Sequence, residues 1–208
     1  EIGLGCRLGE WVIETACAEM AAWDAQGCPP IPVSVNASPA QFRSNEIITQ
    51  VRAALSRNTL AATRLELEIL ESTAVGDSMC INETLTELRN MEIGIALDDF
   101  GTGYSSLVYL TQLPANILKI DRGFITEMLT DQRKQAIIGQ IISLANVLKF
   151  QVIAEGVEEV GQVRMLTEMG CDIFQGYFFS KPLEPEAFVR FQKETEAKLV
   201  LSPANRQA

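Results

Sequence analysis

The feature that most constrains the fold of this chain is a repeated alternation of short apolar runs with longer amphipathic segments. Six runs have the β-branched, apolar composition of buried strands, at 32–35, 65–69, 94–97, 117–120, 151–154 and 172–174. Each is followed by a segment with helical spacing of apolar residues, at 39–57, 78–90, 105–112, 131–148, 158–169 and 184–193. This alternation predicts a parallel sheet covered by helices.

The number of repeats indicates a TIM-type (β/α) barrel that is incomplete at its N-terminus. A closed barrel has eight units and about 250 residues, whereas these 208 residues show about six units after a helix expected over 9–23. Since the chain opens in mid-pattern, we expect the first strand or strands to lie upstream of Glu1. We expect one barrel domain over 1–193 and a polar C-terminal tail over 194–208.

Polar or charged residues stand at the carboxyl end of every predicted strand. They are Asn36, Glu68, Asp98 with Asp99, Lys119 with Asp121, Glu155 and Gln175. In a (β/α) barrel this end is where active sites are built. Any single one could instead cap a helix or satisfy a local hydrogen bond. Their recurrence on six successive strands favours a shared site.

The segment GIALDDFGTGYSSL, at 94–107, places two carboxylates side by side at the end of an apolar run. Successive strand residues point to opposite faces, so Asp98 and Asp99 can converge only where the backbone leaves regular strand geometry. Gly101 and Gly103 make such a departure easier. Converging carboxylates repel unless they are protonated or bridged by a cation. Taken alone, the pair favours another interpretation, an Asp-capped turn before a helix near Ser105.

Composition excludes several classes of function. A net charge of −10 argues against binding a nucleic-acid polymer, which requires a basic surface. The absence of histidine excludes a Ser-His-Asp triad and an imidazole-bound zinc site, so any metal must be held by oxygen ligands. Five scattered cysteines without Cys-x-x-Cys spacing are typical of a reducing compartment, here the cytoplasm. With no apolar run near the roughly 20 residues of a membrane span, no membrane contact is expected.

The oxygen donors at the strand ends match the preferences of Mg²⁺ or Mn²⁺. Several carboxylates in one barrel mouth could hold two ions, an arrangement that serves phosphodiester chemistry. Lys119 could orient the attacking water or screen the phosphate, although a lysine among acidic residues is often a structural ion pair.

Seven blocks in order resemble the EAL domain, the cyclic di-GMP phosphodiesterase family. The resemblance runs from about Gly9 to Leu183. The blocks are VNAS at 35–38 with QF at 41–42, the pair Glu68 and Glu71, DDFGTGYSSL at 98–107, LKID at 118–121, AEGVE at 154–158, QGY at 175–177 and SKPL at 180–183.

The resemblance implies two divalent cations, Mg²⁺ or Mn²⁺, a cyclic di-GMP substrate and a homodimer formed by helices near the loop at 98–107. The implied metal ligands are Asn36, Glu68, Asp98, Asp99 and Glu155, with Asp98 bridging the ions. Lys119 is assigned to the nucleophilic water, and Gln175 and Gly176 to the catalytic mouth and the substrate. The implied loop and supporting residues are Glu71, which holds the loop, Phe100, Gly101, Thr102, Gly103, Asp121 and Glu158.

Two departures bear on function. The Glu-Ala-Leu signature and its metal-binding glutamate would lie upstream of Glu1, and Leu70 stands where the family usually has threonine. The first hypothesis is a phosphodiesterase whose parent domain supplies the upstream glutamate and follows a sensory or regulatory domain. The alternative is a catalytically inactive cyclic di-GMP receptor or protein-interaction module. A weaker third hypothesis is another barrel enzyme acting on phosphorylated substrates.

Overall fold

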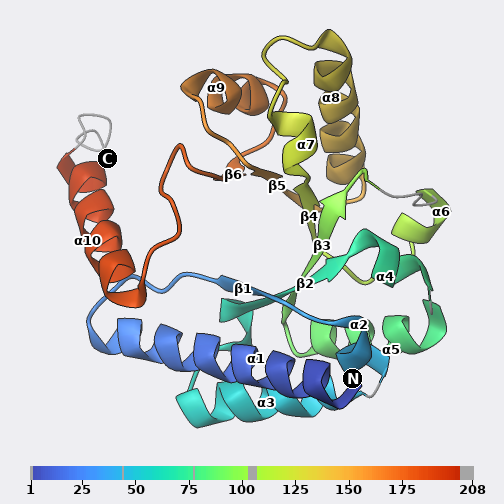
Figure 1. Ribbon diagram of the computed structural model, residues 1–208, viewed down its shortest axis with the longest axis vertical. Coiled ribbons are helices and arrows are strands. Elements are labelled where there is room, and N and C mark those ends of the chain that lie inside the picture. The colour runs from blue at the N-terminus through green and yellow to red at the C-terminus, as the bar shows by residue number, and fades with distance from the viewer. Residues whose placement is uncertain (1, 44, 77, 103–106, 202–208) are drawn as a thin grey trace.

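A single parallel sheet organises the computed structural model, which describes residues 2–43, 45–76, 78–102 and 107–201. Within these residues six strands follow one another in sequence order, each paired in parallel with the next. They are β1 (Val33–Asn36), β2 (Leu65–Leu70), β3 (Gly94–Phe100), β4 (Ile117–Ile120), β5 (Gln151–Glu155) and β6 (Ile173–Gln175). The sheet curls into a half-barrel with β1 and β6 at its edges (Figure 1). The TIM-type fold expected from the alternation is confirmed.

Helices cover the outside of the half-barrel. The helical elements are α1 (Ile2–Ala25), α2 (Pro39–Arg43), α3 (Glu46–Asn58), the 3-10 turn η1 (Ala62–Arg64), α4 (Glu71–Gly76), α5 (Ser78–Asn90), α6 (Leu107–Leu110), α7 (Arg122–Ile125), α8 (Gln132–Val147), α9 (Val160–Glu168) and α10 (Pro185–Leu201). Helices α1 and α3 run alongside one another next to β1 and β2, whereas α8 contacts β4 and β5 at the other end of the sheet (Figure 1). Across the described residues, no helix has the length and apolar character needed to cross a bilayer.

Alternation along the strands separates an apolar outer layer from a polar inner face. On β2, Leu65, Leu67 and Ile69 are fully buried in the hydrophobic core, while Glu66 and Glu68 point to the opposite face because side chains alternate. Burying such apolar side chains contributes roughly 1.5–3 kcal/mol each. The outer layer therefore stabilises the sheet and leaves the inner face available for polar groups.

The structure differs from the sequence expectation at several elements, and two of the differences have a local physical cause. The helix expected over 39–57 is divided into α2 and α3, with Asn45 in a left-handed conformation (φ 57°) between them. The short α7 was not anticipated, and it starts because the Asp121 side chain caps it by accepting from Gly123 N. The last helix continues to Leu201 instead of ending near 193, so residues 194–201 are helical, while 202–208 lie outside the described residues.

Candidate metal centre and active site

The sheet register brings the polar strand ends into one row. Asn36 pairs with Glu68 across β1 and β2, and Glu155 pairs with Gln175 across β5 and β6. Because paired residues of parallel strands point to the same face, these side chains share the inner face of the half-barrel. Lys119 joins the same row from β4, which lies between β3 and β5.

A bulge in β3 makes two adjacent aspartates converge. The register of β3 against β4 shifts between Leu97 and Phe100, so Asp98 and Asp99 both lie opposite Lys119. Asp99 adopts a left-handed conformation with φ of 53°, which aspartate tolerates better than most residues. The departure from strand geometry expected for this pair is therefore present, within residues that belong to β3. The helix start near Ser105 in the alternative interpretation lies outside the described residues.

Lys119 lies at the centre of a buried ionic network. Its Nζ is 2.6 Å from Glu68 Oε1, 2.6 Å from Glu155 Oε1 and 3.2 Å from Asp98 Oδ1. Lys119 and Glu68 are only 3% and 7% exposed. Charges this far from solvent require close partners, and here one ammonium group serves three carboxylates from three strands.

Burial and mutual charge shift the ionisation of this cluster. The pKa of Glu155 is raised by burial, although its hydrogen bond with Lys119 opposes the shift. The pKa of Asp99 is raised by burial and then by the charges of Asp98 and Asp121. Burial alone would lower the pKa of Lys119, but its hydrogen bonds with Glu155 and Glu68 outweigh burial and hold that pKa above its ordinary value. Lys119 is thus a fixed positive charge, and the carboxylates around it are short of compensating charge.

The donor set fits a hard divalent cation. Asp98, Asp99 and Glu155 each offer a carboxylate oxygen within 4.8 Å of the others. Among the described residues, the buried Asp98 Oδ1 has no hydrogen-bond partner and meets only the Lys119 ammonium at ion-pair distance. An acceptor-rich, donor-poor group of this kind is what Mg²⁺ or Mn²⁺ coordination requires.

The two edge strands hold their predicted site residues differently. Asn36 at the end of β1 and Gln175 at the end of β6 are both exposed, so their side chains face solvent beside the buried cluster. Gly176 has a steric reason to be glycine, since a Cβ there would lie 2.1 Å from the Val157 carbonyl oxygen. The structure therefore places these three residues at the rim of the site.

The Glu71 carboxylate ties the loop after β3 to α4. Glu71 Oε2 accepts a hydrogen bond of 2.9 Å from Gly101 N. Thr102 closes the turn, its hydroxyl donating to the Asp99 carbonyl at 2.9 Å. Phe100, expected in the loop, is instead the last residue of β3 and is buried in the core. Gly103 lies outside the described residues.

Sequence reasoning missed the contacts that brace the strand ends. Asp121 caps α7, and Glu158 pairs with Arg122 at 2.9 Å. Gln162, which is 2% exposed, bonds to both the α7 segment and the segment after β5. The Glu159-x-x-Gln162 spacing at the start of α9 is a capping-box signal that could have drawn attention to Gln162.

A half-barrel whose strands bring carboxylates to their carboxyl ends defines the class of (β/α) proteins with an acidic, metal-binding mouth. The family model described as "EAL domain" matches residues 1–182. The chain belongs to the EAL domain family.

Relatives and solved structures agree with this family. The chain is 43% identical over 184 residues to the bifunctional diguanylate cyclase/cyclic di-GMP phosphodiesterase MucR of Pseudomonas aeruginosa, covering 88% of this chain and 27% of MucR. A structure of the MucR phosphodiesterase in complex with cyclic di-GMP superposes with a TM-score of 0.84 at 42% identity, covering 89% of this chain and 75% of that one. A manganese and cyclic di-GMP complex of Klebsiella pneumoniae BlrP1 superposes with a TM-score of 0.74 at 25% identity. The match covers 85% of this chain and 45% of that one. The chain spans about a quarter of the length of the curated relatives it matches.

Proposed function

We propose that this chain is the metal-dependent phosphodiesterase domain of a signalling protein and hydrolyses one phosphodiester bond of cyclic di-GMP to give the linear dinucleotide. The observation that carries the proposal is the convergence of Asp98, Asp99 and Glu155 around Lys119 at the carboxyl ends of β3, β4 and β5. Support for the substrate comes from the relatedness to MucR, a named cyclic di-GMP phosphodiesterase.

The proposed ligands for two divalent cations, Mg²⁺ or Mn²⁺, share the inner face of the half-barrel. They are Asn36, Glu68, Asp98, Asp99 and Glu155. The family resemblance gives Asp98 as the bridging ligand, and its buried Oδ1, which has no hydrogen-bond partner among the described residues, supports a metal contact there. When bound, such ions supply a water of lowered pKa and neutralise charge on the phosphate. The BlrP1 complex with manganese supports the choice of metal.

The remaining residues have proposed roles in binding and positioning. Lys119 is ionised and fixed by Glu68 and Glu155, so it orients the water and offsets phosphate charge instead of acting as a base. Gln175 and Gly176 hold the substrate at the rim. Glu71 holds the loop through Gly101 N.

A second copy of the chain is the proposed partner. The supporting observation is an exposed apolar side chain, Val108 at 66% exposure, on α6 directly after the loop. Sedimentation velocity on the wild type and Val108→Asp tests this. A wild-type dimer that dissociates in the variant is expected, and a monomeric wild type would contradict the proposal.

The activity test is a chromatographic time course with cyclic di-GMP and manganese on the wild type, Glu68→Gln and Glu66→Gln. Glu68 contacts Lys119, whereas Glu66 lies two residues earlier on β2 and accepts from Ser34 at 2.6 Å. We expect linear product from the wild type and Glu66→Gln, and a loss of more than about 100-fold in Glu68→Gln, beyond what supporting residues of a metal site usually cause. Binding of cyclic di-GMP without turnover, both by this chain and by the chain with its upstream glutamate restored, would favour the receptor hypothesis instead.

A further inference from the structure

Two of the strand ends that carry the site are separated in sequence and meet at the mouth. The end of β4 supplies Lys119 and Asp121, and the end of β5 supplies Glu155, which is 2.6 Å from Lys119 Nζ. Beyond these residues the chain leaves the sheet in two different directions, toward α7 and toward α9. The backbone ladder joins β4 to β5 as far as the pair Ile120 and Ala154. Beyond that pair, which Glu155 directly follows, the spacing of the two segments depends on what joins the two exits.

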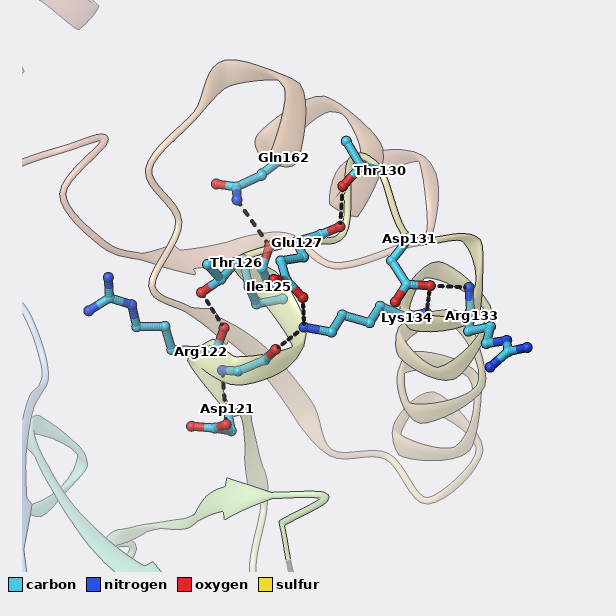
Figure 2. A network of polar contacts seen from close by, with 11 residues as sticks. Asp121, Arg122, Ile125, Thr126, Glu127, Thr130, Asp131, Arg133, Lys134 and Gln162 are labelled. Carbon is cyan, nitrogen blue, oxygen red and sulfur yellow. Dashed lines mark hydrogen bonds and ion pairs between the residues drawn. The ribbon is translucent and has the colours of Figure 1, made fainter.

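Gln162 joins them. Its Nε2 donates to the Ile125 carbonyl at 3.0 Å, and its Oε1 accepts from Glu158 N at 2.7 Å and from Glu159 N at 3.0 Å. Ile125 ends α7, which directly follows Asp121, and Glu158 lies three residues beyond Glu155. Figure 2 shows the Gln162 amide reaching from α9 to the carbonyl of Ile125. The oxygen and the nitrogen of this buried amide thus make three hydrogen bonds between the two exits.

The surroundings make the α7 side of this connection rigid. Asp121 caps α7 through Gly123 N at 2.9 Å, and Lys134 of α8 donates to the Gly123 carbonyl at 2.8 Å (Figure 2). A second tie between the exits, Arg122 to Glu158, lies on the surface with side chains 59% and 46% exposed. An exposed pair of this kind contributes about 0–1 kcal/mol. The buried amide is the stronger of the two ties, because an unsatisfied buried partner is costly.

We propose that Gln162 is a positioning residue for the active site: it fixes the separation of the β4 and β5 ends, and so holds Glu155 in register with Lys119 and the carboxylates of β3. This inference rests on the proposed metal-dependent function. It does not require Gln162 to touch the substrate or a metal ion. Groups that act through a ligand's support typically change metal affinity or activity by about 10- to 100-fold.

The test compares Gln162→Met, Gln162→Glu and the control Gln135→Met. Gln162→Met keeps the side-chain length and removes every hydrogen bond. In Gln162→Glu at pH 8 the carboxylate still accepts hydrogen bonds from two backbone N–H groups at the start of α9. These donors favour the ionised form of the carboxylate. The ionised side chain has no proton to donate to the Ile125 carbonyl. Gln135 donates to the Met128 carbonyl at 2.7 Å without reaching the segment after β5, so its variant removes a comparable bond elsewhere.

Three measurements are made on each protein: manganese affinity by titration calorimetry, amide exchange at Glu158 and Glu159, and the thermal unfolding midpoint. We expect both Gln162 variants to bind manganese about tenfold more weakly, with exchange at the two amides accelerated in Gln162→Met alone. Gln135→Met should match the wild type in manganese affinity. If Gln162 only caps α9, Gln162→Glu will bind manganese with wild-type affinity, and this result would overturn the proposal. An equal loss of manganese affinity in Gln135→Met would also overturn it.

The outcome is separable from that of the proposed function. Wild type that binds manganese but does not hydrolyse cyclic di-GMP overturns the phosphodiesterase proposal while the affinities still decide the role of Gln162. Wild type that turns over substrate with unchanged manganese affinity in both Gln162 variants overturns the positioning role alone. Wild type that binds no manganese overturns both.

Discussion

The centre and the edges of the sheet use the same position, the carboxyl end of a strand, in opposite ways. On the central strands, Glu68 and Lys119 are almost completely buried and their charges compensate one another. On the edge strands, Asn36 and Gln175 are neutral, exposed and open to solvent. The centre therefore couples stability to charge, whereas the edges can change ligand contacts with little effect on the fold. The predictions below separate these two behaviours.

The largest effect is expected at the bulge. Asp98→Asn removes the negative charge of the carboxylate whose buried Oδ1 has no hydrogen-bond partner among the described residues. We expect cyclic di-GMP turnover to fall more than about 100-fold, beyond the effect of losing a supporting residue. Product release by chromatography measures it. Asp172→Asn, an exposed acid just before β6, is the control. Activity within about threefold of wild type would remove Asp98 from the site.

Lys119→Met tests the charge balance at the centre. The variant leaves Glu68, Asp98 and Glu155 without their shared cation. We expect the free energy of unfolding in EDTA to fall by about 3–5 kcal/mol, with part of it recovered on adding manganese. Urea unfolding gives both values.

The surface comparison is Arg57→Met, which breaks the ion pair of Arg57 with Glu14, whose side chains are 62% and 35% exposed. Its loss should be below about 1 kcal/mol. Similar losses of stability in Lys119→Met and Arg57→Met would mean that burial does not distinguish the central network from a surface ion pair.

At the edge strands we expect the opposite: substitutions there should change turnover and leave stability nearly unchanged. Asn36→Ala and Gln175→Ala are expected to change the free energy of unfolding by no more than about 0.5 kcal/mol, as at other exposed positions, while each lowers turnover. Urea unfolding and steady-state kinetics on the same samples check both parts. A large stability loss would show that the edge residues are coupled to the buried cluster after all.

The loop tie should have a smaller effect than the metal ligands. Glu71→Ala removes the carboxylate that accepts from Gly101 N, a loss of about 1–3 kcal/mol for a charged hydrogen bond, and turnover should fall indirectly. Exchange of the Gly101 amide would accelerate. Full activity in this variant would leave the loop without a functional role.

The smallest effect is a pH dependence of the metal-free chain. The folded protein holds the proton of Asp99 more tightly than the unfolded chain does, because its pKa is raised above 3.8. More protons bound in the folded state means that stability falls as pH rises through the interval between the unfolded and folded pKa values. Asp99→Asn should lose this contribution in urea unfolding above pH 4, with EDTA present. An identical pH profile in the variant would count against a raised pKa.

Much of the fold could be predicted from sequence because it depends on local periodicity. The apolar runs at 65–69 and 117–120 became β2 and β4 with almost the same bounds. The convergence of Asp98 and Asp99 was also predictable in form, since adjacent acids can meet only through a bulge. Short elements such as α7 could not be predicted from sequence. This helix depends on a cap by Asp121 and on a hydrogen bond from α8, and neither contact leaves a periodic pattern in the sequence.

The supporting contacts of the site were less predictable than its acids. A carboxylate after an apolar run is visible in the sequence, but the partner of a buried amide is chosen by tertiary structure. Gln162 lies 37 residues from the carbonyl it binds at Ile125. The spacing of the capping box predicts a helix start and nothing about α7.

Because of the bulge in β3, the number of residues in this strand decides how many side chains lie opposite Lys119. Removing one residue between Leu97 and Phe100 would restore an uninterrupted register with β4, and a lone aspartate would then remain opposite Lys119. No substitution at Asp98 or Asp99 can imitate that outcome, because substitutions leave the extra residue in place. A family of such proteins can vary the acids at these two positions by substitution, but it can gain or lose the second position itself only through an insertion or a deletion.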